Sequence, residues 1–161
     1  MIILGIDPGT ATTGYGLIEK NPKSKAKNGL RYIECGCIRT SPSLSDPERL
    51  VDLQKGLAKI IRQHNPGAMA IEKIYFFKNL KTAMPVSQAK GVILLEAAKR
   101  KIPVFEFTPL QVKISVTGFG RAEKKQVQYM VKMILGLKET PKPDDAADAL
   151  AVGICGSNFV K

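Results

Sequence analysis

Three aspartates stand close together late in the sequence, in the stretch PDDAADALAV at 143–152. Asp145 and Asp148 are three residues apart, and Asp144 and Asp148 are four apart. In a helix, either spacing places two carboxylates on one face. Acids at the start of a helix also interact favourably with its dipole. The spacing therefore leaves open whether these aspartates begin a helix or bind a ligand, and which pair would do so.

Two further carboxylates follow short apolar runs. Asp7 comes after IILGI, and Glu72 comes after AMAI. If both runs are neighbouring parallel strands, the two carboxylates project from the same edge of the sheet, where α/β proteins form their sites. Taken singly, each residue has an ordinary explanation, because Asp-Pro-Gly is a common turn and a glutamate at a strand end is usually solvated.

Four carboxylates at one place would repel one another unless a cation lies among them. Oxygen ligands of this kind suit Mg²⁺ or Mn²⁺. The chain as a whole is basic, with 25 Lys and Arg against 14 Asp and Glu and a net charge of +11, which points to a polyanionic partner such as nucleic acid. A basic protein with an acidic, metal-binding cleft suits phosphodiester cleavage by two metal ions.

The composition argues against several other classes of protein. His64 is the only histidine, which removes most Ser-His and Cys-His nucleophile pairs and His-rich zinc sites. Three cysteines, an odd number, argue against a disulfide framework and for a reducing compartment. No apolar run approaches the length of a membrane span, and the start MIILGID lacks the basic region of a signal peptide. We therefore expect a cytoplasmic protein without membrane association.

Hydrophobic periodicity predicts the elements that must position these residues. Strands are expected at about 2–6, 15–18, 32–38, 68–71 and 103–107, and helices from Asp46 to Asn65 and over about 79–100, 109–116, 123–136 and 143–156. Pro85 should interrupt or start the second helix. The first three strands should form an antiparallel meander, and strands separated by helices should be parallel. We predict one three-layer α/β domain over 1–157 and a short tail at 158–161.

Six segments, in order along the chain, resemble a known family. They are GIDPGTATTGYGLIE at 5–19, AIEKIYFFKN at 70–79, QAKG at 88–91, PVFEF at 103–107, QVKISVTGFGRAEKKQVQYMV at 111–131 and DAADALAV at 145–152. A lone D-x-G or D-x-x-D is a weak signal, but the ordered set resembles the RuvC family of Holliday junction resolvases, within the RNase H-like superfamily. The resemblance implies an α/β, RNase H-like three-layer fold with a five-stranded mixed sheet and helices on both faces.

The resemblance also implies an activity. It implies a Mg²⁺-dependent endodeoxyribonuclease of DNA recombination and repair, a homodimer that binds a four-way junction and nicks two strands symmetrically, leaving 5′-phosphate and 3′-hydroxyl ends. Partnership with the RuvA–RuvB branch-migration complex is implied as well. Two Mg²⁺ ions per site are expected, with Mn²⁺ as a substitute. Asp144 would then have only a helix-start role, and the catalytic, metal-binding carboxylates would be Asp7, Glu72, Asp145 and Asp148.

Further residues match family positions near DNA. Lys113 and Lys124 correspond to lysines beside the scissile phosphate and the junction backbone, where they would screen phosphate charge; otherwise they are solvated helix lysines. Tyr75 falls where the family has an aromatic that could stack on unpaired bases, although Phe76 or Phe77 is expected in the core. The remaining expected DNA contacts are basic: Lys73, Lys78, Lys81 and Arg121.

The helix after this segment corresponds to the family's dimer helix. Gly91 on it would allow backbones to approach closely, although a core helix against the sheet is the other interpretation. Pro85 departs from the family pattern, since the family's helix normally continues there. The residues expected on the contact face are Gln88, Gly91, Leu94 and Leu95.

Other functions fit parts of the pattern. An RNase H-like nuclease acting on RNA, or on other branched DNA, would carry the same carboxylates. A non-catalytic nucleic-acid-binding protein would use the acids only structurally. An actin-like phosphotransferase would share Asp7-x-Gly9-Thr10, but 161 residues are too few for its second lobe.

Overall fold

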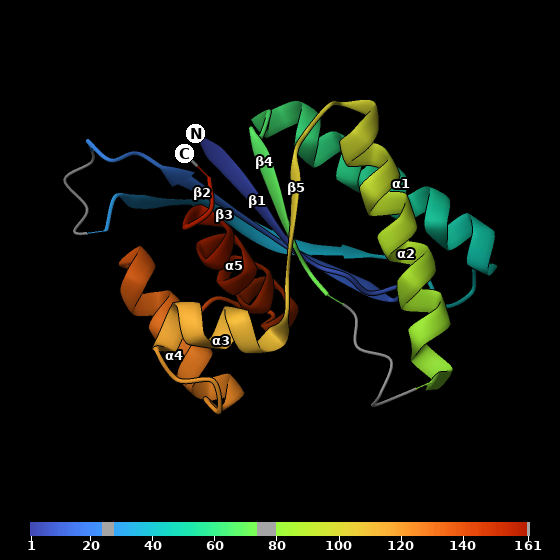
Figure 1. The fold of residues 1–161 in the computed structure, drawn as a ribbon. Coiled ribbons are helices and arrows are strands. Elements are labelled where there is room, and N and C mark those ends of the chain that lie inside the picture. Colours follow the sequence, from blue (N-terminus) through green and yellow to red (C-terminus); the bar gives the residue numbers. More distant parts are fainter. Residues whose placement is uncertain (24–27, 74–79, 161) are drawn as a thin grey trace.

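The computed structural model describes residues 1–23, 28–73 and 80–160, and of 80–82 the backbone alone. This part of the chain contains five strands and five helices, in the predicted order (Figure 1). The strands are β1 (Ile2–Asp7), β2 (Thr12–Lys20), β3 (Leu30–Arg39), β4 (Ala68–Glu72) and β5 (Val104–Phe107). The helices are α1 (Asp46–His64), α2 (Leu80–Lys99), α3 (Pro109–Thr117), α4 (Lys124–Leu135) and α5 (Asp144–Ser157).

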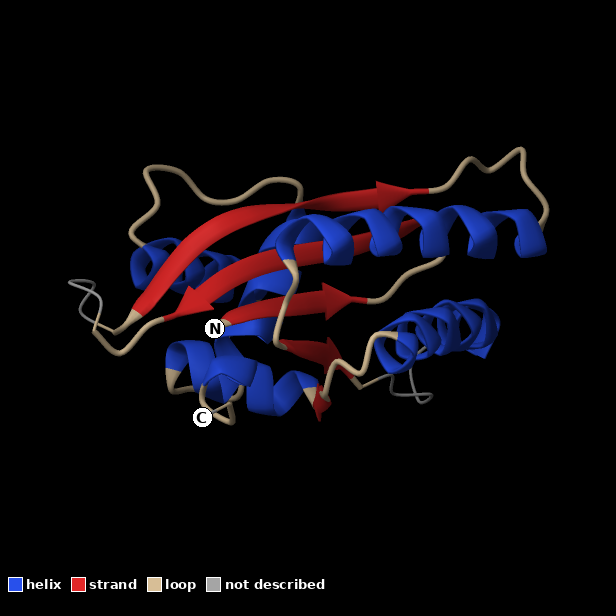
Figure 2. Cartoon of the chain, turned by 90° about the horizontal axis from the view of Figure 1, so that it is seen from above, coloured by secondary structure: helices blue, strands red, loops and turns tan. Residues whose placement is uncertain are grey.

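The strands form one mixed sheet in the order β3-β2-β1-β4-β5. β1 pairs antiparallel with β2, and β2 pairs antiparallel with β3. Across the other side of the sheet, β1 pairs parallel with β4, and β4 pairs parallel with β5. The strands lie side by side and twist across the sheet (Figure 2). These pairings confirm the predicted mixed sheet: the consecutive strands β1, β2 and β3 are antiparallel, whereas β4 and β5, which follow helices, pair in parallel.

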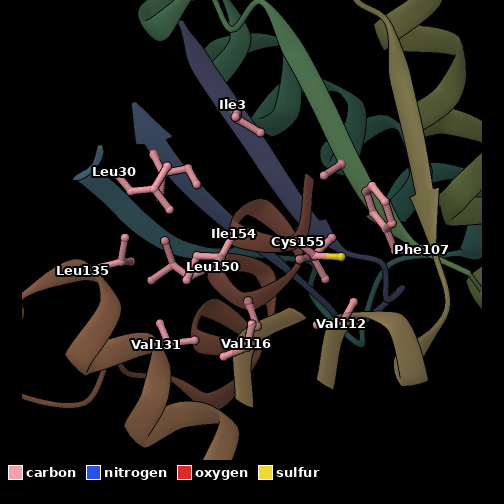
Figure 3. Packing of buried hydrophobic residues seen from close by; sticks show 14 of the residues in the cluster. Ile3, Leu30, Phe107, Val112, Val116, Val131, Leu135, Leu150, Ile154 and Cys155 are labelled. Atoms are coloured by element: carbon pink, nitrogen blue, oxygen red, sulfur yellow. The ribbon is translucent and has the colours of Figure 1, made fainter. Parts of the chain in front are cut away.

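Helices cover both faces of the sheet, which gives the three layers that were expected. α1 and α2 lie on one face, and α3, α4 and α5 lie on the other (Figure 1). The first face encloses a core made largely of leucine and isoleucine from the sheet, α1 and α2. The second core surrounds α5 and includes Ile3, Val116, Val131 and Leu150 (Figure 3).

α5 lies unusually close to the sheet, and glycines on the strands make this possible. A Cβ atom at Gly5 would overlap the carbonyl oxygen of Ala149. A Cβ atom at Gly14 would overlap the carbonyl oxygen of Asp145 and come within 3.1 Å of its Cβ. The small alanines of α5 are buried against the same strands. This close packing fixes the height of the α5 aspartates above the sheet.

Pro85 neither starts nor interrupts α2, so that expectation was wrong. The helix begins at Leu80 and continues through Pro85 to Lys99. Proline lacks the backbone N–H that would bond to the carbonyl four residues earlier. Because Pro85 is near the start of the helix, the loss is confined to its first turns.

Within the described residues, no helix is both long enough and apolar enough to cross a membrane.

Candidate active site

Two of the predicted carboxylates stand at neighbouring strand ends. Asp7 is the last residue of β1 and Glu72 the last of β4. The two strands are parallel, with Ile6 opposite Ile71. Side chains alternate along a strand, and Ile3 and Ala68 belong to the core around α5. Asp7 and Glu72 therefore project from the same edge, on the face that carries α5.

The first turns of α5 bring the other two carboxylates to this edge. Asp145 lies directly over Gly14 of β2, which is opposite Asp7 in the sheet. Asp148 follows one turn later and lines a pocket of about 200 Å³ together with Glu72, Lys113 and Lys124. The structure thus brings together Asp7, Glu72, Asp145 and Asp148, although they lie up to 141 positions apart in the chain.

The carboxylates act strongly on one another. Burial, followed by the charges of Glu72, Asp148 and Asp145, raises the pKa of Asp7 to about 7. Burial, followed by the charge of Asp148, raises the pKa of Glu72, although Lys113 opposes this. Burial also raises the pKa of Asp148 against the opposing hydrogen bond from Lys124. The site therefore holds more negative charge than its own cations neutralise.

This donor set fits a hard divalent cation. All four side chains offer oxygen, the ligand type that Mg²⁺ and Mn²⁺ prefer. A cation bound among them would offset both the burial and the neighbouring charges that raise the pKa of Asp7. In the described part of the chain, no three His, Cys, Asp or Glu side chains are already arranged to hold a metal ion, so the carboxylates would have to move toward one.

Lys124 forms ion pairs with two aspartates of α5. Its Nζ lies 2.9 Å from Oδ2 of Asp148 and 3.4 Å from Oδ2 of Asp144. Although burial acts in the opposite direction, the hydrogen bond to Asp148 and its charge raise the pKa of Lys124. Sequence reasoning gave Asp144 only a helix-start role and missed this pair, which depends on how α4 packs against α5.

Lys113 on α3 and Lys124 on α4 each lie near the start of a helix that is fixed by capping hydrogen bonds. The N–H of Gln111 donates to the Thr108 hydroxyl at 3.1 Å, and the Gln111 side chain accepts from the Thr108 N–H at 2.8 Å. This capping box fixes the start of α3, which carries Lys113. At α4, the Glu123 N–H donates to the Gln126 side chain at 2.8 Å. The following residue, Lys124, is thereby directed at the carboxylates.

The other expected DNA contacts are only partly described. Lys73 directly follows Glu72 and is exposed, and its backbone N–H donates to the carbonyl of Phe107 at 2.7 Å. Arg121 is exposed in the turn between α3 and α4. Tyr75 and Lys78 lie outside the described residues, as do Phe76 and Phe77. For Lys81, only its backbone position in α2 is described.

One face of α2 is open. Leu95 is 59% exposed and Met84 is 69% exposed. Gln88 and Gly91 are exposed on the same helix, and a Cβ atom at Gly91 would meet no atom within 4 Å. The helix therefore combines a core face against α1 with an exposed, partly apolar face.

A five-stranded mixed sheet, covered by helices on both faces and ending in converging carboxylates, defines the class: an RNase H-like protein with a nuclease-type acidic site. The family model described as "Crossover junction endodeoxyribonuclease RuvC" matches residues 3–156. The chain belongs to the RuvC family.

Individual relatives agree with this assignment. The crossover junction endodeoxyribonuclease RuvC of Pelotomaculum thermopropionicum is 57% identical over 155 residues, which cover 96% of this chain and 92% of the relative. The solved structure of Thermus thermophilus RuvC has a TM-score of 0.89 at 33% identity, over 99% of this chain and 95% of that one. A second structure, of T. thermophilus RuvC in complex with Holliday junction substrate, has a TM-score of 0.90 at 33% identity, over 99% and 94% of the two chains.

Proposed function

We propose that this chain is a Mg²⁺-dependent endodeoxyribonuclease that resolves four-way DNA junctions by paired nicks. The observation that carries the proposal is the meeting of Asp7, Glu72, Asp145 and Asp148 at one edge of an RNase H-like sheet. Membership of the RuvC family supplies the class of substrate. The net charge of +11 suits a polyanionic substrate.

The four carboxylates would hold the divalent metal, with two Mg²⁺ ions per site and Mn²⁺ as a substitute. When bound, the metal would supply a water of lowered pKa and stabilise the leaving oxygen of the phosphodiester. Asp7, whose pKa is raised to about 7 by burial and by the charges of the other three carboxylates, would be the central ligand. Its sheet neighbours fix its position, because β1 is paired on both sides.

Lys113 and Lys124 would act on the phosphate. Both line the pocket beside Glu72 and Asp148. An ammonium group here would lower the repulsion between the carboxylates and the DNA, and would stabilise the charge that develops on the phosphate oxygens. Cleavage of the bond to the 3′-oxygen would leave 5′-phosphate and 3′-hydroxyl ends.

A homodimer would supply the second active site. A junction with two-fold symmetry calls for two equivalent sites related by a two-fold axis. The exposed face of α2, with Met84, Gln88, Gly91 and Leu95, is the proposed contact. The RuvA–RuvB branch-migration complex is the proposed cellular partner, and the cytoplasm the proposed compartment, since both follow from a role in DNA recombination and repair.

The test compares cleavage and binding of a four-way junction with those of linear duplexes, with cut sites mapped. We expect symmetric paired nicks in Mg²⁺ or Mn²⁺, none in EDTA, and tighter binding to the junction than to duplex DNA at moderate salt. Equal affinity for both DNAs would overturn the junction proposal. Preferred cutting of RNA, or of other branched DNA, would favour the related RNase H-like activity instead.

A further inference from the structure

The end of β3 reaches the same edge as the carboxylates. Gly14 of β2 is opposite Asp7 on one side and opposite Cys37 on the other, and Thr12 is opposite Arg39. The edge at which β1 ends is therefore also the edge at which β3 ends. Arg39 is the last residue of that strand.

The side chain of Arg39 lies on the face that carries α5. The register between β2 and β3 shifts at Leu17/Ile18, and beyond this irregularity the alternation is regular. Cys35 packs against the core around α5, whereas Ile38 packs against the α1 core. Because residues two and four positions apart share a face, Cys37 and Arg39 face the same way as Cys35. Electrostatics agree: after burial, which raises the pKa of Cys37, the next largest influences are Asp145, which raises it, and Arg39, which lowers it.

Arg39 stands on the opposite side of the carboxylates from the two lysines. Glu72 and Lys113 lie together in the pocket on the β4 side of Asp7. Asp145 lies over β2, and Arg39 on β3 is one strand further out. Neighbouring strands are about 4.8 Å apart and residues along a strand about 3.4 Å apart. Arg39 is two strands across from Asp7 and two residues further along, so its backbone is about 12 Å from that of Asp7. A strand of duplex DNA advances about 3.4 Å per nucleotide along the helix axis, so this span corresponds to about three to four nucleotides.

Arg39 is exposed. In the described part of the chain it forms no ion pair, whereas Arg31, at the other end of β3, pairs with Glu19 at 2.8 Å. An arginine stays charged at all physiological pH values and binds phosphate oxygens in a two-pronged geometry. Arg39 is too far from Asp7 to contact the scissile phosphate at the carboxylate site, but it is well placed to contact a neighbouring phosphate.

We propose that Arg39 binds a phosphate of the cleaved strand a few nucleotides from the cut, on the side opposite Lys113 and Lys124. The strand would cross the carboxylates between these two sets of cations. Arg39 would thus be a positioning residue, not a catalytic one. The inference rests on the proposed nuclease function and adds the direction in which the substrate strand crosses the site.

Arg39→Gln and Arg39→Lys test this, with Arg31→Gln as the matched control on the same strand. Because a flanking contact is made equally in the ground state and the transition state, it should change KM and not kcat. For Arg39→Gln we expect junction KM to rise about 10-fold at unchanged kcat and melting temperature, since charged hydrogen bonds are the strong ones. The slope of log affinity against log salt should fall by about 0.9. Arg39→Lys should recover part of the loss, and Arg31→Gln should change KM less than about two-fold.

A scan of neutral methylphosphonates along the cleaved strand identifies the phosphate. In the wild type, one neutral phosphate within about four nucleotides of the cut, on the Arg39 side, should raise KM. In Arg39→Gln the same replacement should have no further effect. The inference is overturned if Arg39→Gln cuts with wild-type KM, if it loses stability instead of affinity, or if its defect adds fully to every replacement. Failure of the wild type to cut the unmodified junction would instead overturn the proposed function.

Discussion

Asp7 is the residue on which the charge balance of the site depends. It ends a central strand among three other carboxylates, and burial, followed by the charges of these neighbours, raises its pKa from the ordinary 3.8 to about 7. In the metal-free protein at neutral pH, burial and repulsion therefore oppose the ionised form of Asp7. The same unfavourable charge would become favourable once a divalent cation is bound.

The first prediction concerns the stability of metal-free Asp7→Asn. Below pH 3.8 the wild-type carboxyl is protonated in both folded and unfolded states, so the variant should gain nothing. As pH rises toward 7 the unfolded state ionises first, and the wild type loses stability that the amide keeps. At 1.36 kcal/mol per pKa unit, the variant should be more stable at pH 8 by on the order of 2–4 kcal/mol.

Denaturant unfolding in EDTA at pH 4 and pH 8 measures this difference. Mg²⁺ should stabilise the wild type more than Asp7→Asn, because binding to the folded state alone raises stability. The charge balance described for the site would be contradicted if the stability gain of Asp7→Asn over wild type were no larger at pH 8 than at pH 4.

The second prediction separates neighbouring aspartates. Asp145 lies over Gly14 at the carboxylate edge, whereas the side chain of Asp144 is 66% exposed and contacts Lys124 only at 3.4 Å. Asp145→Asn should lower cleavage by at least about 100-fold, because even the outer-shell partners of metal ligands contribute about 10–100-fold. Asp144→Asn should lower it only a few-fold, since Lys124 keeps its closer partner Asp148. Single-turnover cleavage under equal Mg²⁺ compares them, and an essential Asp144 beside a dispensable Asp145 would mean that the ligand register is shifted by one residue.

For individual residues, the sequence predicted which carboxylates would lie together, but not which cationic side chains would lie beside them. Strand ends could be recognised from apolar runs, and the D-x-x-D choice came from family resemblance. The Lys124 pair depends on the packing of α4 against α5. The orientation of Arg39 depends on the irregularity at Leu17/Ile18. That irregularity reverses the face of every later residue on β3, and nothing in the local sequence indicates it.

Among the elements, α5 determines the geometry of the site, and its closeness to β1 and β2 depends on glycine. Periodicity predicted α5 to within a residue at each end. Its height above the sheet was not predictable, because that height is decided by Gly5 and Gly14 on strands more than 130 positions earlier. The continuation of α2 through Pro85 was also missed, since a proline in the first turns of a helix removes only one hydrogen bond.

The third prediction tests this close packing. Gly14→Ala would place a methyl group against the carbonyl of Asp145. Overpacking of this kind costs about 1–3 kcal/mol, and it should lift the first turn of α5 away from Asp7. We expect lower stability and a cleavage rate reduced more than junction affinity.

Gly153→Ala is the control for this substitution. It adds the same methyl group on α5, where the nearest atoms, on Gly5, lie at an ordinary contact distance of 3.6 Å, and alanine favours a helix over glycine by about 1 kcal/mol. Its melting temperature should be unchanged or higher. Equal stability and activity of Gly14→Ala and wild type would show that α5 is not held by this contact.

For the whole molecule, the exposed face of α2 is the feature that a single chain does not explain. Leu95 and Met84 are large apolar side chains on a helix whose other face already packs against α1. Exposed apolar groups gathered on one helix are typical of an interface. Sequence resemblance predicted a dimer helix here, but the exposure of Met84 could only be seen in the folded chain.

The fourth prediction concerns this surface. Leu95→Glu should shift the protein from dimer to monomer, because it would bury a charge at the contact. Sedimentation should show the monomer, and the variant should nick one strand of a junction without coordinated cutting of the second. Val51→Glu, at a 49% exposed position on α1, should remain a dimer with paired cutting. A Leu95→Glu dimer that makes paired cuts would move the interface elsewhere.

The most direct test of the metal-dependent carboxylate site is the single-turnover cleavage of a bound four-way junction by Asp7→Asn and Glu72→Gln. Each substitution removes one negative charge that faces phosphate, so junction binding should be retained or tightened. Cleavage in saturating Mg²⁺ should fall by at least about 100-fold, because each removes a ligand from the site. Cleavage at the wild-type rate by either variant, with the junction bound, would contradict the assignment of these carboxylates to the active site.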